Sequence, residues 1–151
     1  MQVTQLGEGD PEYSIIGSVH GDEPCGRKAI ERFLEEDWEV KKPVQFIIAN
    51  ERALERDVRF TEADLNRSFP GNPDGEHYEQ ILAHKIFEKV KGTKYIDIHS
   101  TKSFERPFAN FSDDNSTIRS LISSTGAKYA VHFPINAGAL SEIGDGFTLE
   151  A

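Results

Sequence analysis

Residues 13–24 read YSIIGSVHGDEP, and this stretch decides the fold. Its first part, residues 13–17, is largely apolar and predicts a buried strand. Pro24 suits the first position of a helix, where a backbone N–H would have no partner. Between strand and helix, a tight loop carries His20 and Glu23. An imidazole and a carboxylate held this close can bind the same divalent ion, so the stretch predicts a strand, a metal-binding loop and a helix in succession.

Apolar strands alternate with amphipathic helices along the rest of the chain. Strands are predicted at residues 3–6, 13–17, 44–49, 94–98, 129–133 and 146–150, and helices at residues 24–37, 76–91 and 115–124. The buried stripe of the second helix is predicted to contain Tyr78, Ile81, Leu82, Ile86 and Val90. This alternation predicts an α/β fold of three layers, with a central mixed, largely parallel sheet flanked by helices. Residues 50–74 are loop-rich, and so long an irregular stretch in a compact domain is usually functional.

The composition is that of one acidic domain. Its 151 residues suit a single hydrophobic core, and the formal net charge is −9. Because no cluster of Lys or Arg offsets this charge, nucleic acid and membranes are disfavoured as partners. We see no membrane-spanning run and no secretory signal, and the single cysteine, Cys25, fits a reducing cytoplasm. An anionic substrate would need local cations in its pocket.

A third metal ligand is expected because hydrolytic zinc sites usually have three protein ligands and one position for water. His99 directly follows the strand at residues 94–98, much as His20 follows the strand at residues 13–17. Sites in such folds lie beyond the carboxyl ends of strands, so two neighbouring strands could present both imidazoles to one point. The other histidines are explained more simply by a helix surface or a strand: His77, His84 and His132.

Four ordered motifs support a more specific interpretation: His20-Gly21-Asp22-Glu23, Asp64-Leu65-Asn66-Arg67, Asp97-Ile98-His99 and Thr148-Leu149-Glu150. In this order they resemble the motifs of the succinylglutamate desuccinylase/aspartoacylase family. That family belongs to the wider zinc carboxypeptidase superfamily, so the resemblance implies a zinc-carboxypeptidase-like fold. The motifs span nearly the whole chain.

The resemblance implies a role for each motif residue. His20, Glu23 and His99 would bind one Zn²⁺ per chain, and Asp64 would orient a zinc histidine. Asn66 and Arg67 would hold the carboxylate of the amino-acid part of the substrate, for which a guanidinium fork is well suited. Arg59 would polarise the scissile carbonyl and stabilise the oxyanion. Glu150 would be the general base that activates water and passes the proton to the leaving amine.

Simpler roles remain open for several of these residues. Arg67 could form a surface ion pair, and Arg52 or Arg56 could stand in for Arg59. Asp97, which points the same way as His99 on a strand, could orient that histidine or be a buried acceptor. Cys25 is more simply a small buried helix residue than a nucleophile, which would need an activating base.

Two departures from the family's pattern bear on substrate and activity. Members that release aspartate carry another Arg shortly before the catalytic Glu, whereas no Lys or Arg follows Lys128 here. The second carboxylate of a diacid substrate therefore lacks its expected partner. Family members also continue beyond the position of Glu150 and carry a small β-rich domain. We expect residues 1–151 to be a catalytic domain that is incomplete at its C-terminus, and to bind zinc with weak or no turnover alone.

The resemblance implies a zinc-dependent deacylase that cleaves the amide bond of an N-acyl amino acid, a small-molecule substrate. Two alternatives stay open. One is a zinc carboxypeptidase acting on peptide C-termini with the same residues, and the other is a metal-binding fragment without turnover. Self-association into a homo-oligomer also stays open.

Overall fold

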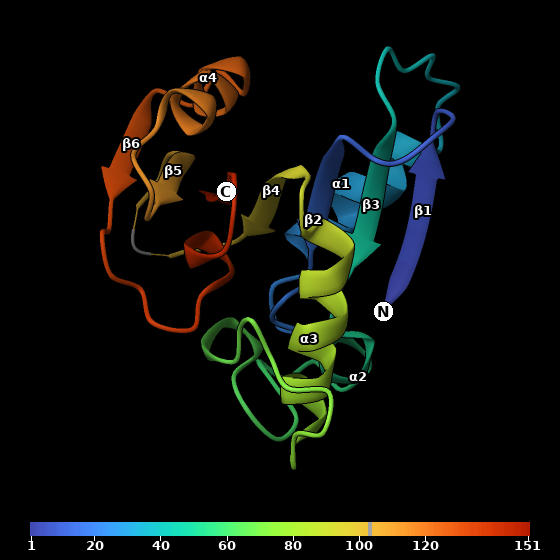
Figure 1. The fold of residues 1–151 in the computed structure, drawn as a ribbon, viewed down its shortest axis with the longest axis vertical. Coiled ribbons are helices and arrows are strands. Elements are labelled where there is room, and N and C mark those ends of the chain that lie inside the picture. Colours follow the sequence, from blue (N-terminus) through green and yellow to red (C-terminus); the bar gives the residue numbers. More distant parts are fainter. Residues whose placement is uncertain (103) are drawn as a thin grey trace.

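A seven-stranded mixed sheet forms the centre of the computed structural model, which describes residues 1–102 and 104–151 (Figure 1). Its strands are β1 (Gln2–Leu6), β2 (Tyr13–Gly17), β3 (Val44–Ile48), β4 (Lys94–His99), β5 (Phe108–Phe111), β6 (Tyr129–His132) and β7 (Gly146–Glu150). They lie in the order β1-β3-β2-β4-β7-β5-β6. Only the β1–β3 and β5–β7 pairs are antiparallel, which confirms the predicted mixed, largely parallel sheet.

Helices cover both faces of this sheet. They are α1 (Cys25–Leu34), α2 (Glu51–Glu55), α3 (Tyr78–Val90) and α4 (Ser116–Ser124), with short 3₁₀ turns η1 (Leu65–Arg67) and η2 (Leu140–Glu142). Figure 1 shows α3 in front of the sheet and α1 behind it. Among the helices of the described residues, none combines the length and apolarity that a membrane crossing requires.

The core is divided between the helices that cover the sheet. Leu82 and Ile86 of α3 pack with Ile16, Ile47 and Tyr95 from β2, β3 and β4. A smaller cluster joins α4 to β5 and β7, and its members are Ala109, Phe111, Ile118, Ile122 and Phe147. These clusters complete the three layers that the alternation predicts.

Two glycines bring α1 into direct contact with the sheet. A Cβ on Gly17 would lie 2.5 Å from the carbonyl carbon of Gly26, and a Cβ on Gly26 would lie 2.8 Å from the carbonyl oxygen of Ile98. Such distances are too short for a side chain. The close approach fixes the start of α1, and with it the loop that carries His20 and Glu23, against β2 and β4.

Helix α1 ends earlier than predicted, and Trp38 contacts its last turn. The helix is predicted over residues 24–37 but stops at Leu34, with Pro24 as its N-cap rather than its first residue. The Trp38 ring stacks on Phe33, with centroids 5.0 Å apart, and its indole N–H donates to the Phe33 carbonyl at 2.9 Å. The last carbonyls of a helix have no partner within the helix, and the Trp38 indole supplies one for Phe33.

The buried stripe of α3 differs from the prediction at two positions. Tyr78 and Ile81 are only half-buried, whereas Glu79 and Ala83 are buried beside Leu82, Ile86 and Val90. A charged residue at a buried position is uncommon and needs compensating hydrogen bonds.

Two short elements, strand β5 and helix α2, were not predicted. Strand β5 has four residues, and α2 has five and lies in a region predicted to be loop. Asn50 starts α2 by accepting a hydrogen bond from the Ala53 N–H at 3.2 Å, and Asp64 starts η1 by accepting from the Asn66 N–H at 2.9 Å. Local caps, rather than a long periodic pattern, define these elements.

Candidate metal and active site

The candidate site is a cleft of about 370 Å³ at the carboxyl ends of β2, β4 and β7. It brings together every predicted site residue except Asp64, which contacts His20 instead. The lining residues are His20, Glu23, Arg59, Asn66, Arg67, His99, Ser100, Thr101, Asn110, Phe133, Asn136 and Glu150. Segments far apart in the sequence therefore meet at the carboxyl ends of these three neighbouring strands.

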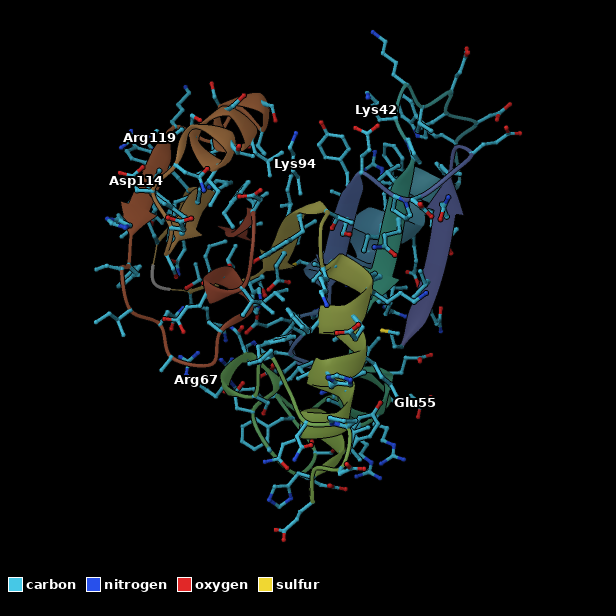
Figure 2. All side chains as sticks on the ribbon, viewed as in Figure 1. Lys42, Glu55, Arg67, Lys94, Asp114 and Arg119 are labelled. Atoms are coloured by element: carbon cyan, nitrogen blue, oxygen red, sulfur yellow. The ribbon has the colours of Figure 1, made fainter. Side chains whose placement is uncertain are left out.

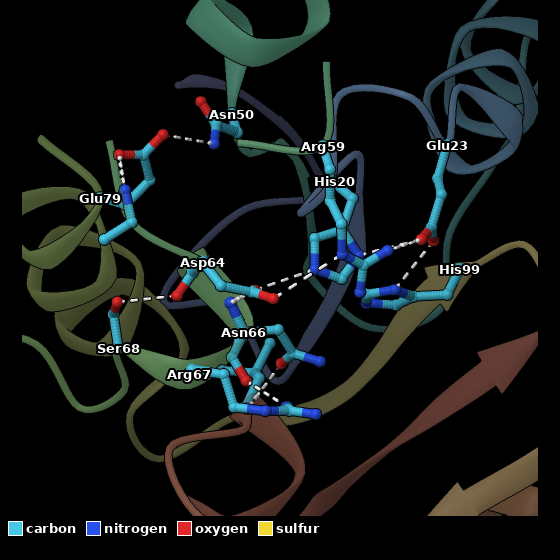
Figure 3. Close-up of polar contacts among 12 residues, drawn as sticks. His20, Glu23, Asn50, Arg59, Asp64, Asn66, Arg67, Ser68, Glu79 and His99 are labelled. Carbon is cyan, nitrogen blue, oxygen red and sulfur yellow. Dashed lines mark hydrogen bonds and ion pairs between the residues drawn. The ribbon is translucent and has the colours of Figure 1, made fainter. Parts of the chain in front are cut away.

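Glu23 lies between the two imidazoles. Its Oε1 is 3.0 Å from Nδ1 of His20, and its Oε2 is 3.0 Å from Nδ1 of His99. Ligand atoms from the three residues lie within 4.8 Å of one another, and both histidines are buried. The Ser100 N–H also donates to Glu23 Oε2 at 3.1 Å, which holds the carboxylate in place. The three side chains thus form a preassembled group of metal-ligand type (Figure 3).

The outer nitrogen of each imidazole faces another carboxylate. His20 Nε2 is 3.1 Å from Asp64 Oδ1, and His99 Nε2 is 2.7 Å from Asp97 Oδ2. With Nε2–H donated to these carboxylates, Nδ1 of each ring is the nitrogen that could bind a metal ion once it has lost its proton. Metal-binding histidines commonly have such a partner, which sets the tautomer and the ring orientation. The residues present therefore fit a divalent metal ion.

The same contacts balance charge within this group. Burial lowers the pKa of His20, but hydrogen bonds to Asp64 and Glu23 outweigh it and raise the pKa overall. For His99, burial is likewise outweighed by the charge of Asp97, and its pKa lies well above the usual value. Burial raises the pKa of Glu23, but hydrogen bonds from both histidines lower it strongly overall. Binding of a metal ion would therefore compete with protonation of the two imidazoles.

Of Arg52, Arg56 and Arg59, it is Arg59 that lines the cleft. Its guanidinium donates to Glu23 Oε1 at 2.9 Å, and its Nε lies 3.7 Å from Asp64 Oδ2. Arg52 instead lies over the Tyr78 ring, 3.9 Å from the ring centroid, and Arg56 does not line the cleft. Of the three arginines left open by the sequence, only Arg59 stands beside the candidate metal ligands.

The η1 turn presents Asn66 and Arg67. Leu65 anchors it in the core, and Asn66 Oδ1 accepts from the Leu140 N–H at 3.1 Å. A Cβ on Gly138 would lie 2.4 Å from the Arg67 carbonyl oxygen, so the segment before η2 lies directly against η1. Figure 2 shows Arg67 beside this segment. The backbone of this turn is therefore held beside the cleft from two sides, and the exposed Arg67 guanidinium donates to the Asn66 carbonyl at 2.7 Å.

Glu150 is held inside the sheet. It lies opposite His99 in the β4–β7 pair and opposite Phe108 in the β5–β7 pair, and the Ala151 N–H donates to the His99 carbonyl at 2.9 Å. Burial raises the pKa of its carboxyl. The charge of His99 opposes this rise, but Glu23 adds to it, so the pKa is above the usual value. The carboxyl lines the same cleft as Glu23 and His99.

Several cleft residues were missed by sequence reasoning. Ser100 directly follows His99 and could have been found from that position. Asn110 lies on the unpredicted strand β5, and Phe133 and Asn136 follow β6 without a local pattern. Their place in the cleft depends on the pairing of distant strands.

The remaining singled-out residues lie elsewhere. None of the other three histidines is among the residues that line the cleft, and His132 stacks on Phe111 at the sheet edge. Cys25 is half-buried and begins α1. Asp97 is fully buried and orients His99, so both roles left open for it apply.

Comparisons with known proteins support the family resemblance drawn from the motifs. Residues 10–139 match the family model described as the succinylglutamate desuccinylase/aspartoacylase catalytic domain. An N-acyl-aromatic-L-amino acid amidohydrolase (carboxylate-forming) of Xenopus tropicalis is 31% identical over 117 residues, which cover 67% of this chain and 37% of that protein. A probable aspartoacylase of Prochlorococcus marinus is 34% identical over 95 residues, covering 58% and 32% of the two chains.

The fold also has solved counterparts. A succinylglutamate desuccinylase from Chromobacterium violaceum superposes with a TM-score of 0.80 at 20% identity, covering 98% of this chain and 56% of that one. Murine aminoacylase 3 superposes with a TM-score of 0.70 at 19% identity, covering 96% and 56%. The chain spans about a third of the length of the curated relatives named above. With a family model matched over most of its length, the chain belongs to the succinylglutamate desuccinylase/aspartoacylase family.

Proposed function

We propose that the protein is a zinc-dependent amidohydrolase that cleaves an N-acyl amino acid into a carboxylic acid and a free amino acid. One observation carries this proposal. A Glu23 carboxylate between two oriented imidazoles shares its cleft with two arginines and the carboxyl of Glu150. The relatives include an N-acyl-aromatic-L-amino acid amidohydrolase and probable aspartoacylases, which supports the same reaction class.

His20, Glu23 and His99 would hold one zinc ion, with Asp64 and Asp97 orienting the two imidazoles. Two His and one Glu form a ligand set that zinc hydrolases use. When bound, zinc supplies Lewis-acid polarisation of the carbonyl and acidification of water.

The other cleft residues would bind the substrate and move protons. Arg67, with Asn66, binds the carboxylate of the amino-acid part through a guanidinium fork. Arg59 stabilises the negative charge that develops on the carbonyl oxygen. Glu150 takes a proton from the attacking water as the new C–O bond forms, and donates it to the nitrogen as the C–N bond breaks. The raised pKa of Glu150 suits a group that must accept and then release a proton.

The substrate would be a small N-acyl amino acid with one essential carboxylate. Among the described residues that line the cleft, Arg59 and Arg67 are the arginines, and no lysine is present. If Arg59 serves the carbonyl oxygen, one arginine remains for a carboxylate. The acidic composition and single cysteine support a cytoplasmic location without nucleic-acid partners.

A panel of substrates tests the proposal. The zinc-loaded protein is incubated with N-acetyl and N-succinyl amino acids and, separately, with peptides that have free C-termini. We expect release of the amino acid from N-acyl substrates, at a low rate because residues 1–151 are expected to turn over weakly alone. Cleavage of peptides alone would instead support a zinc carboxypeptidase, which would use the same residues, and cleavage of neither would leave a metal-binding module.

A further inference from the structure

Glu79 is a fully buried carboxylate outside the cleft. It lies on α3 with 0% of its surface exposed. Removing a carboxylate from water is costly unless hydrogen bonds replace the lost solvation. The donors of these bonds belong to residues 61–63 and to Asn50, and none of them lies on α3 itself.

Five donors converge on this carboxylate. Oε1 accepts from the Thr61 N–H and the Thr61 hydroxyl, both at 2.7 Å, and from Asn50 Nδ2 at 3.3 Å. Oε2 accepts from the N–H groups of Glu62 and Ala63, both at 3.1 Å. Every donor is electrically neutral. Three consecutive main-chain N–H groups are thereby bound to one side chain (Figure 3 shows Glu79 beside Asn50).

The segment bound in this way joins two residues of the candidate site. Arg59 precedes Thr61 by two positions and contacts Glu23, and Asp64 directly follows Ala63 and contacts His20. Asn50 adds a further connection, because the same side chain starts α2 and donates to Glu79. The Glu79 carboxylate therefore connects this segment to α2 and α3, alongside the Glu62 carboxylate, which accepts from the Tyr78 N–H at 2.7 Å.

We propose that Glu79 is a positioning residue, which holds residues 61–63 so that Arg59 and Asp64 reach Glu23 and His20. Its effect on catalysis rests on the function proposed above. Asn66 and Arg67 lie in the turn that Asp64 caps, but they have further anchors in Leu65, Leu140 and Gly138. Glu79 therefore acts on carbonyl activation and the metal ligand His20 more than on carboxylate binding.

Glu79→Gln tests this role while keeping the side-chain shape. An amide N–H₂ then faces an N–H or hydroxyl donor, and the segment must shift. We expect the amide protons of residues 61–63 to lose protection from hydrogen exchange and zinc affinity to fall about tenfold through Asp64. We expect kcat, normalised to bound zinc, to fall about 10- to 100-fold, since small displacements in an active site cost this much. KM should stay within about twofold because the Asn66 and Arg67 anchors are intact.

Glu88→Gln is the matched control, since Glu88 is an exposed glutamate on the same helix and the charge change is identical. Should Glu79→Gln fail to fold, Thr61→Val removes one donor and leaves the carboxylate bound by the others. It should give the same changes at smaller amplitude.

A double-mutant cycle separates positioning from general destabilisation. In an Arg59→Ala background, Glu79→Gln should lower kcat, normalised to bound zinc, by clearly less than in the wild type, because one of the two groups it positions is gone and only Asp64 remains. An undiminished effect in that background, or unchanged exchange of residues 61–63, would overturn the proposal. If the wild-type protein hydrolyses no substrate, the proposed function fails, but hydrogen exchange and zinc affinity still decide the role of Glu79.

Discussion

Glu150 differs from the other carboxylates of the cleft because it is outside the group of candidate metal ligands. Glu150→Gln preserves the side-chain shape and the pairing of β7 but removes the proposed base. We expect kcat to fall by about 10²- to 10⁴-fold, the usual contribution of general acid–base catalysis. Zinc content, measured by atomic absorption, should not change. Loss of zinc would make Glu150 a ligand, and an unchanged rate would remove it from the mechanism.

Arg67 is suited to binding a carboxylate because its guanidinium is exposed and its backbone is fixed. Arg67→Lys keeps the charge but loses the fork, and Arg67→Ala loses both. We expect KM for an N-acyl amino acid to rise about 10- to 100-fold in Arg67→Ala, the value of a charged hydrogen bond. The lysine variant should fall between this value and the wild type.

Arg56→Ala is the control, since Arg56 is exposed and does not line the cleft. Initial rates over a range of substrate concentrations measure the effect. Equal KM values for Arg67→Ala and Arg56→Ala would show that Arg67 does not bind the substrate carboxylate.

The metal-ligand group could be predicted because its members occur at special places in the sequence. His20 and Glu23 lie between a strand and a helix, and His99 ends a strand. Glu79 was not identified, although a signal exists. It shares the helical spacing of Leu82, Ile86 and Val90, and a charged residue at a buried position indicates a specific set of donors.

At the scale of elements, the buried carboxyl of Glu79 on α3 makes the free energy of unfolding depend on pH. Burial raises its pKa, but hydrogen bonds from Thr61, Ala63 and Asn50 outweigh this and lower the pKa below its usual value. A carboxyl with a lowered folded-state pKa stabilises the protein above its unfolded-state pKa. That stability is lost as the pH falls through the folded-state pKa.

We therefore expect a pH-dependent difference between wild type and Glu79→Gln. The gap in their free energies of unfolding should be largest above about pH 5 and should narrow at lower pH. Urea unfolding of the metal-free proteins at several pH values measures it. A gap independent of pH would contradict the expectation.

Gly138 allows two surface elements to touch. Its φ is +78°, and an added Cβ would lie 2.4 Å from the Arg67 carbonyl oxygen. Gly126 has a similar φ of +74°, but an added Cβ would meet nothing within 4 Å. Alanine at either position costs about 1–2 kcal/mol of backbone strain. Gly138→Ala should lower Tm further and raise KM by displacing η1. Equal losses of Tm and equal KM values in both variants would show that the contact is unimportant.

The longer elements could be predicted because apolar periodicity extends over several residues, as in β2 and α3. Strand β5 and helix α2 could not, since Asn110 interrupts the apolar run of β5 and five residues are too few to show a helical period. Both are specified by their surroundings: β5 by pairing with β6 and β7, and α2 by the Asn50 cap.

At the scale of the whole molecule, a bound metal would connect parts of the fold that are separate in sequence. His20 follows β2, Glu23 precedes α1, and His99 ends β4. A ligand that binds only the folded state stabilises it by about 2.7 kcal/mol at 100 times its Kd. We expect a chelator to lower Tm and added zinc to restore it, with magnesium as the control because it prefers oxygen ligands. An unchanged Tm would indicate that no metal binds this group.

The strand order could not be predicted from the sequence. Periodicity identifies β7 as a strand, but nothing local indicates that it lies between β4 and β5. Pairing of residues 95–99 with residues 146–150 is a long-range property. Consequently the placement of Asn110 and Asn136 in the cleft was also beyond sequence reasoning.

The position of β7 has a consequence for the order in which the protein is built. In the sheet, β5 and β6 join the other strands only through β7, which is made after them. On the ribosome, the nascent chain has all three candidate metal ligands once residue 99 has emerged, but its proposed base comes 51 residues later, at position 150. Long-range pairing is slow to form. The strand that completes the sheet also delivers Glu150, so a chain that has bound metal but not closed its sheet has no base with which to hydrolyse a substrate.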